Sequence, residues 1–237
     1  MSDLHVEIEG DGPNLVMLHG GGGQIGDLDD LRSLLRPGRR VISPDQRGHG
    51  RSPGGPDISY AAQARETSEL LDELGIRNAD LVGWSDGGIV GLLMARDRPD
   101  LVGRLVAISA NAALDSKPPA VAGHVLEWVT TVKPSEIDMP SSRAKLPDAG
   151  AEWPTTAAQI LEMWREGPHL SISDLTRISS RVLYIAADRD IVPLAHTVAM
   201  FEATRDARLA ILPGADHHLP IKRAAEVAGL VDDFLTS

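Results

Sequence analysis

The residues best suited to chemistry in this chain are Gly83-Trp84-Ser85-Asp86-Gly87, a G-x-S-x-G pattern. An apolar run, residues 79–82, precedes the pattern, and a helix-like stretch, residues 88–95, follows it. A strand, a sharp turn and a helix in this order expose a serine hydroxyl at the turn, where it can act as a nucleophile. Because the turn is crowded, glycines two residues before and after the serine let strand and helix approach each other. Ser85 is therefore the candidate nucleophile.

A serine nucleophile needs a base, and the base needs a carboxylate that fixes its tautomer. Two further apolar runs resemble strands and end in turns that carry these residue types. Asp188 and Asp190 follow the first run, and His217 and His218 follow the second. Functional side chains of α/β sheets gather at the carboxyl ends of strands. The sequence therefore predicts a Ser, Asp, His constellation, in that chain order, at one edge of a sheet.

Five segments together resemble the landmarks of the α/β-hydrolase superfamily, in their usual order and over nearly the whole chain: residues 18–22, 45–52, 83–87, 190–193 and 213–217. The turn at residues 83–87, known as the nucleophile elbow, is most similar to that of valacyclovir-hydrolase-like and enol-lactonase-like esterases. The resemblance implies that Ser85 is the nucleophile, Asp190 the acid and His217 the base. It also implies that the backbone N–H groups of Gly21 and Asp86 form the oxyanion hole.

The register of the family turns favours Asp190 over Asp188 and His217 over His218. The chain departs from the family at Asp216, which stands where glycine usually precedes the histidine. A second carboxylate at this position either perturbs the base or faces solvent. Trp84 is expected to pack behind the elbow.

Residues 111–175 interrupt the alternation of strands and helices with seven prolines, and two amphipathic stretches remain, residues 120–132 and 154–166. Their place after a strand predicts a small helical lid over Ser85. Trp128 and Trp164 are candidate substrate-binding residues, although for most apolar side chains of these stretches packing of the lid on the body is the favoured interpretation. The Asp86 carboxylate is a third candidate, since the resemblance suggests the amino group of an amino-acid ester as its ligand. The alternative for Asp86 is a hydrogen bond to the lid or the body.

The remaining pattern predicts an α/β-hydrolase fold, in which a mainly parallel central sheet carries helices on both faces, as a single domain over residues 1–237. Residues 4–9 are predicted as an antiparallel edge strand. Ser59 and Gly75 mark the start and end of the first long helix, and residues 224–234 form the last one. Further strands are predicted at residues 15–18, 40–43, 105–109, 181–187 and 207–212.

Composition narrows the class of protein. The formal net charge of −11 over 237 residues argues against nucleic acid or an anionic membrane as a partner. The absence of cysteine excludes disulfides, thiolate-bound zinc and a cysteine nucleophile. The first residues resemble no signal peptide, so a cytoplasmic, soluble protein is expected. The resemblance requires neither a metal nor an organic cofactor, and it sets no oligomeric state.

These observations predict a serine hydrolase of small carboxylic esters or lactones. A C–C hydrolase, an acyltransferase or a perhydrolase would use the same triad. A hydrolase-fold binding protein without turnover is an alternative of another class. A further alternative is an NAD(P)-dependent oxidoreductase, because residues 21–26 fit G-x-G-x-x-G and Asp45 ends the next strand. The acidic residues 27, 29 and 30 argue against it, since they would repel a pyrophosphate.

Overall fold

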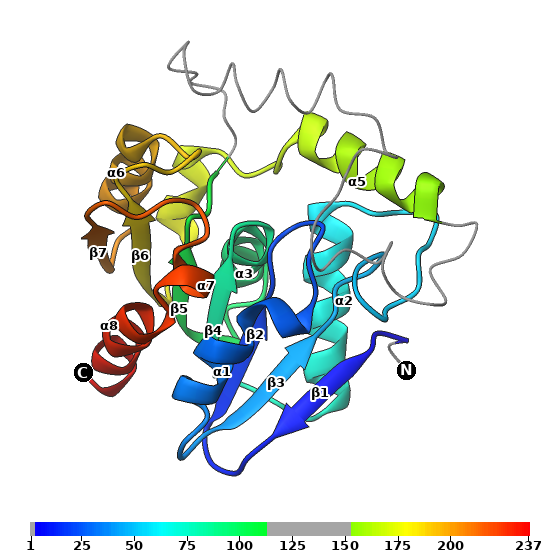
Figure 1. Ribbon diagram of the computed structural model, residues 1–237, viewed down its shortest axis with the longest axis horizontal. Coiled ribbons are helices and arrows are strands. Elements are labelled where there is room, and N and C mark those ends of the chain that lie inside the picture. The colour runs from blue at the N-terminus through cyan, green and yellow to red at the C-terminus, as the bar shows by residue number, and fades with distance from the viewer. Residues whose placement is uncertain (1–2, 113–152) are drawn as a thin grey trace.

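A seven-stranded sheet forms the centre of the protein in a computed structural model that describes residues 3–112 and 153–237 (Figure 1). The spatial order of the strands is β1-β3-β2-β4-β5-β6-β7. β1 pairs antiparallel with β3, and every other neighbouring pair is parallel. The strands are β1 (Val6–Glu9), β2 (Asn14–Leu18), β3 (Arg40–Pro44), β4 (Ala79–Trp84), β5 (Val102–Ile108), β6 (Arg181–Ala187) and β7 (Ala207–Leu212).

Helices connect the parallel strands and cover both faces of the sheet. β4 shows why the strands are apolar on both sides: Leu81 packs in a core with residues of α2, α3 and α6, whereas Val82 packs in a second core with residues of α1 and α8. Among the described helices, none is both long and apolar enough to cross a membrane. The helices are η1 (Ile25–Leu28), α1 (Asp29–Leu35), α2 (Tyr60–Glu73), α3 (Asp86–Asp97), α5 (Trp153–Glu166), η5 (Ile172–Arg177), α6 (Leu194–Ala203), α7 (Leu219–Lys222) and α8 (Ala224–Thr236).

The predicted fold class is confirmed, and so are the antiparallel edge strand and the bounds of the long helix. Ser59 caps α2, where its side chain accepts a hydrogen bond from the Ala62 N–H at 3.2 Å. Gly75 follows α2 with φ 66°, a conformation that glycine adopts without steric cost. The last helix, α8, extends two residues beyond the predicted end.

Helix α5 is the longest described element of the predicted lid, and it lies above α2 and away from the sheet (Figure 1). Its inward residues Ala157, Ile160 and Met163 are almost completely buried. The Gln159 side-chain amide donates to the Gly55 carbonyl oxygen at 2.9 Å. α5 is therefore fixed to the loop before α2. The other predicted amphipathic stretch and Trp128 lie outside the described residues.

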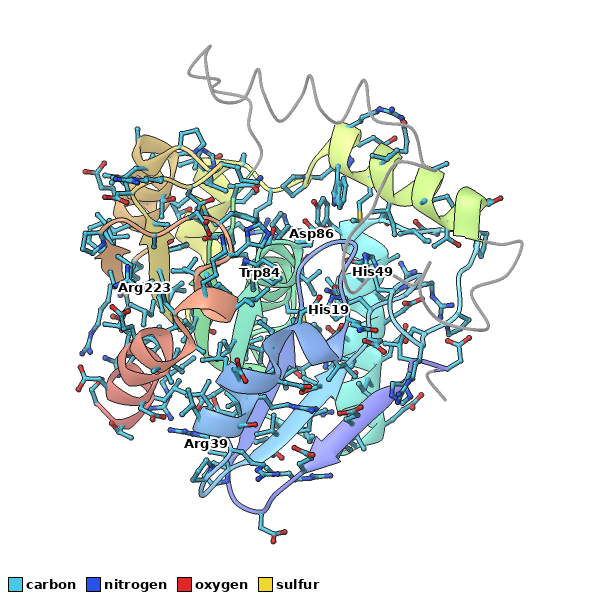
Figure 2. The ribbon with its side chains drawn as sticks, in the orientation of Figure 1. His19, Arg39, His49, Trp84, Asp86 and Arg223 are labelled. Carbon is cyan, nitrogen blue, oxygen red and sulfur yellow. The ribbon has the colours of Figure 1, made fainter. Side chains whose placement is uncertain are left out.

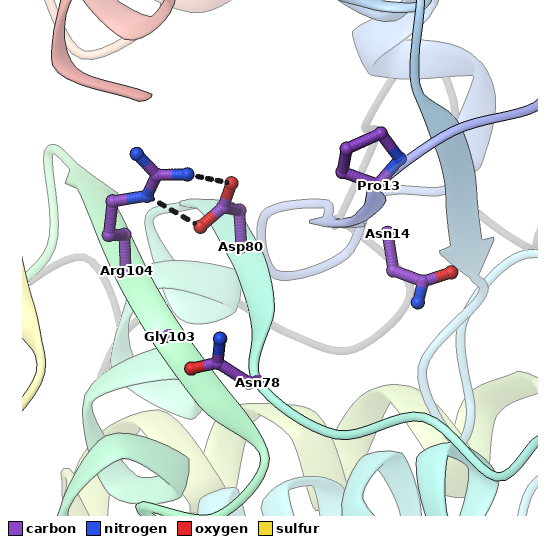
Figure 3. A pocket seen from close by; sticks show the side chains of 6 residues that line it. All are labelled: Pro13, Asn14, Asn78, Asp80, Gly103 and Arg104. Carbon is purple, nitrogen blue, oxygen red and sulfur yellow. Dashed lines mark hydrogen bonds and ion pairs between the residues drawn. The ribbon is translucent and has the colours of Figure 1, made fainter. Parts of the chain in front are cut away.

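The amino ends of β2, β4 and β5 surround a polar hollow of about 390 Å³ (Figure 3). Asp80 of β4 and Arg104 of β5 pair on one side of the hollow, with N–O distances of 2.9 and 3.0 Å (Figure 3). Because Ser85 follows the carboxyl end of β4, this hollow lies at the opposite edge of the sheet from the candidate nucleophile. The Arg104 guanidinium also donates to the Leu235 carbonyl oxygen, so the ion pair joins the sheet to α8.

Candidate active site

Ser85 occupies the turn between β4 and α3 with φ 53° and ψ −118°. Such a conformation is costly for a residue with a side chain, and the surrounding structure must enforce it. A Cβ on Gly83 would lie 2.3 Å from the Gly87 oxygen, and one on Gly87 would lie 2.3 Å from the Leu18 oxygen. Gly83 therefore permits the close approach of β4 and α3 that the sequence pattern predicted, whereas Gly87 permits the close approach of α3 to the end of β2.

The structure brings Ser85, His217 and Asp190 together from three different strand ends. The His217 Nε2 atom lies 2.9 Å from the Ser85 Oγ atom. On the other side of the ring, Nδ1 lies 2.7 Å from Asp190 Oδ1. A neutral imidazole with its proton on Nδ1 donates to the carboxylate and leaves Nε2 free to accept the serine proton. These are the contacts that a nucleophile, a base and an orienting acid require.

The Asp190 side chain is buried, and three donors hold its carboxylate. Burial raises the pKa of Asp190, but the hydrogen bonds from His217, from the Ser109 hydroxyl and from the Val192 N–H outweigh it. The pKa of Asp190 is therefore below its ordinary value, and the group is a carboxylate at neutral pH. Sequence reasoning missed Ser109, although its position directly after β5 is a signal of the same kind as those used for Asp190.

Trp84 is buried behind the elbow, as predicted, and it also contacts the base. Its indole N–H donates to the His217 carbonyl oxygen at 2.8 Å. The Trp84 and His217 rings lie 5.9 Å apart between centroids. The residue before the nucleophile thus holds the backbone of the candidate base, a contact that the sequence pattern did not reveal.

The two competing residues make other contacts. Asp188 accepts a hydrogen bond from the Gly214 N–H at 2.7 Å, which stabilises the turn after β7. The His218 side chain is 51% exposed and lies 3.7 Å from the Asp216 carboxylate. Asp216 pairs with Lys222 at 2.5 Å, and this hydrogen bond lowers the pKa of Asp216. The unusual carboxylate before His217 therefore faces the surface.

A second G-x-S-x-G pattern, residues 50–54, contains Ser52. The Ser52 hydroxyl donates to the Asp45 carbonyl oxygen at 2.5 Å and accepts from the His5 N–H at 2.9 Å. It is completely buried. This serine holds a loop in place, and the strand that precedes Ser85 is what distinguishes the two patterns.

The loop after β2 carries the predicted oxyanion donor Gly21, and His19 shapes it. The Gln46 N–H donates to His19 Nε2 at 3.0 Å, so Nδ1 must carry the ring proton that is shared with the Gly20 oxygen at 2.7 Å. Figure 2 shows His19 beside His49, which belongs to the loop after β3. The neutral His19 ring therefore joins the two loops at the carboxyl edge of the sheet.

Asp86 and Trp164, both predicted to bind substrate, contact each other beside Gly21. The Trp164 indole N–H donates to Asp86 Oδ2 at 2.7 Å, and the Tyr60 hydroxyl donates to Oδ1 at 2.9 Å. Asp86 is only 6% exposed. Burial raises the pKa of Asp86, although the hydrogen bonds from Trp164 and Tyr60 lower it in part. The alternative given to Asp86 from sequence, hydrogen bonds to lid and body, is thus present in the structure.

The Asp45 carboxylate, which the oxidoreductase alternative required, has another use. It accepts hydrogen bonds from the N–H groups of Ile25 and Arg51, each at 2.8 Å, and it is 2% exposed. A buried carboxylate with these partners cannot reach a ribose hydroxyl. Across residues 3–112 and 153–237, no three His, Asp or Glu side chains gather as a metal site would need.

A protein-family match covers most of the chain. Residues 15–230 match the family described as "Alpha/beta hydrolase family". The chain belongs to this family, so the resemblance drawn from the five landmarks is confirmed.

Among its relatives, the serine hydrolase BPHL of Homo sapiens is 26% identical over 98% of this chain and 82% of its own length. The sn-1-specific diacylglycerol lipase ABHD11 of Mus musculus is 36% identical, but the match covers 56% of this chain and only 43% of that protein. The enol-lactonase of Burkholderia xenovorans LB400 has a similar structure, with a TM-score of 0.76, 23% identity and coverage of 99% and 96% of the two chains. At this identity the structural likeness shows the fold.

Proposed function

We propose that this protein is a serine hydrolase that cleaves small carboxylic esters or lactones through an acyl-enzyme. The observation that carries the proposal is the continuous hydrogen-bond chain from Ser85 through His217 to Asp190, with contacts of 2.9 and 2.7 Å. Membership of the alpha/beta hydrolase family supports it. So do the relatives whose names state serine hydrolase and enol-lactonase activity.

In the first step, Ser85 Oγ attacks the carbonyl carbon of the ester while His217 Nε2 takes the hydroxyl proton. The carbonyl π electrons move to oxygen and form an oxyanion. The proposed donors to this oxyanion are the N–H groups of Gly21 and Asp86. Asp86 is the first residue of α3, so its N–H has no acceptor within the helix, and the positive end of the helix dipole favours a negative charge there.

In the second step, the bond from carbon to the leaving oxygen breaks, and His217 Nε2 returns its proton to that oxygen. The alcohol departs, or remains attached to the acyl group when the substrate is a lactone. Water then attacks the acyl carbon as His217 Nε2 takes one of its protons. Collapse of the second oxyanion breaks the bond from carbon to Ser85 Oγ, His217 returns its proton to Oγ, and the acid is released. Asp190 stays ionised throughout and stabilises the imidazolium.

A preference for amino-acid esters is a separate prediction. Both Asp86 oxygens already accept a hydrogen bond, so a substrate ammonium would have to share them with Tyr60 and Trp164. The test compares an amino-acid ester with its analogue that lacks the amino group. If the preference exists, Asp86→Asn removes it and leaves the two substrates equal.

The proposed function is tested with a panel of p-nitrophenyl esters and small lactones. We expect hydrolysis by the wild-type protein, and we expect Ser85→Ala to lower kcat by about 10⁴-fold or more, because triad residues act as a unit. A fluorophosphonate should add its mass to the wild-type protein at Ser85 and leave Ser85→Ala unmodified. Survival of activity in Ser85→Ala would refute the assignment of the nucleophile.

The same panel separates the alternative activities. Addition of an alcohol as acyl acceptor would divert product from acid to ester if acyl transfer dominates. One equivalent of p-nitrophenol, released without further turnover, would indicate a binding protein rather than an efficient enzyme. Steady release of acid with water as the only acceptor is the result that the proposal requires.

A further inference from the structure

The hydrolytic steps use the backbone N–H of Asp86 and leave its side chain without a part in the reaction. Asp86 is nevertheless buried, with only 6% of the residue exposed, and it directly follows the nucleophile in the chain. A buried carboxylate is stable only where donors satisfy it. The helices that carry these donors are therefore the parts of the fold that the Asp86 side chain connects.

The two donors come from two other elements of the fold. Tyr60, the first residue of α2, donates to Oδ1, and Trp164 of α5 donates to Oδ2. They lie 26 and 78 residues from Asp86 in the chain. Figure 2 shows Asp86 at the end of α3 that faces α5. The carboxylate thus joins α2, α3 and α5 at one point beside Ser85.

The third contact at this point is the loop that carries Gly21. A Cβ on Gly21 would lie 2.0 Å from Asp86 Oδ2 and 2.9 Å from Trp164 Cζ2. The edge of the indole and the carboxylate oxygen therefore lie directly against this residue. A charge-assisted hydrogen bond of 2.7 Å fixes the orientation of the indole above Gly21.

We propose that the Asp86 carboxylate is a positioning group, which holds the Trp164 indole against Gly21 and thereby fixes the Gly21 N–H and shields it from water. This inference rests on the proposed serine-hydrolase function. An oxyanion donor is most effective when it is oriented in advance and water is excluded from it. Trp164 supplies the shield, and Asp86 and Tyr60 supply the geometry.

Helix α5 offers a matched control for the Trp164 contact. Gln159, on the same helix, donates a hydrogen bond of 2.9 Å to the Gly55 oxygen. Its removal takes one attachment of α5 away without touching Gly21. If activity falls because α5 is less firmly attached, substitution of Gln159 and substitution of Trp164 should both lower it. A positioning role predicts that only substitution of Trp164 lowers it.

The first experiment measures kcat and KM for a neutral p-nitrophenyl ester. We expect Trp164→Phe, which keeps a ring but removes the N–H, to lower kcat by about tenfold to a hundredfold, the usual effect of losing a hydrogen bond to a charged group. KM should change by less than about threefold, because the contact acts in the transition state. Gln159→Ala should stay within about twofold of wild type on both constants.

Substitutions of Asp86 separate geometry from charge. Asp86→Ala should lower kcat at least as much as Trp164→Phe, and the double variant should lose no more than Asp86→Ala alone, because the two residues form one contact. The kcat of Asp86→Asn should be about tenfold higher than that of Asp86→Ala, since the Asn amide can accept from Trp164 and donate to the Tyr60 oxygen. Additive losses, or equal losses in the Asn and Ala variants on the neutral ester, would overturn the proposal.

Hydrogen–deuterium exchange without substrate gives a readout that does not depend on turnover. We expect faster exchange at residues 160–166 of α5 in Asp86→Ala and an unchanged rate in Asp86→Asn. Unchanged exchange in Asp86→Ala would overturn the positioning role, even if the protein hydrolyses esters. Failure of the proposed function would show differently, as activity that survives Ser85→Ala.

Discussion

Gly21→Ala adds one methyl group at the most crowded point of the candidate oxyanion hole. The new Cβ would lie 2.0 Å from Asp86 Oδ2 and 2.7 Å from Asp86 Cγ. Contacts this short do not occur, so about 1 Å of separation has to be gained by moving either the carboxylate or the loop. Each route breaks something that the proposed reaction needs.

The cost of each route follows from the contacts. Movement of the carboxylate breaks its hydrogen bonds with Trp164 and Tyr60, and each bond to a charged group contributes about 1.5–3 kcal/mol. Movement of the loop takes the Gly21 N–H away from the oxyanion, and loss of one such donor lowers kcat by about 10²–10³-fold. We therefore expect Gly21→Ala to lower kcat by about 10²-fold or more.

Steady-state hydrolysis of p-nitrophenyl acetate measures this loss, and Gly26→Ala is the matched control. A Cβ on Gly26 would have its nearest neighbour, Asp29 Oδ2, at 3.7 Å, which is an ordinary contact. Gly26→Ala should therefore keep kcat within about twofold of wild type. If Gly21→Ala keeps the wild-type kcat, this result would refute both the oxyanion role of Gly21 and the steric conflict between the added methyl group and the Asp86 carboxylate.

Three further predictions concern histidines and the tryptophan of the elbow. His217→Gln should lower kcat by about 10⁴-fold or more, whereas His218→Gln should stay within about threefold; the reverse order would show that the base is misassigned. Trp84→Phe removes the hydrogen bond to the His217 oxygen and should lower kcat by about tenfold, and an unchanged kcat would contradict that role. Burial lowers the pKa of His196 below its ordinary 6.5, so between the two pKa values the unfolded chain binds a proton that the folded chain does not. The contribution of His196 to the free energy of unfolding is therefore fully present above about pH 6.5. As the pH falls below that value, the free energy of unfolding decreases by at most about 1.4 kcal/mol per pH unit. Urea unfolding between pH 5 and 8 should show this decrease for wild type relative to His196→Gln, and parallel curves would contradict it.

Much of the fold follows from local patterns in the chain. The apolar runs predicted the strands, because strands buried between two layers of helices need apolar residues on both faces. Ser59 and Gly75 predicted the ends of α2, since a cap and a left-handed residue act within one turn of the helix.

Helix α6 was not predicted, and its composition explains why. Its buried residues include His196 and Thr197 along with Met200, so no apolar stripe of helical period marks it. The short α7 gives no periodic signal either, because four residues barely complete one turn.

The sequence by itself determined the family, the sheet and the three residues whose side chains meet in the structure, Ser85, Asp190 and His217. These residues directly follow strands, and parallel strands bring their carboxyl ends to one edge, so position along the chain implies position in space. The role of each in catalysis stays a prediction until the variants are assayed.

Only the tertiary structure decided which side chains hold those residues in place. Trp84 reaches the His217 backbone across 133 residues of chain, and Asp86 meets Trp164 across 78. No periodicity or spacing encodes such pairs, because each depends on how separate helices and loops pack above the sheet. The same packing excludes the ribose-binding role that the oxidoreductase alternative gave to Asp45, because its carboxylate accepts hydrogen bonds within the body of the protein.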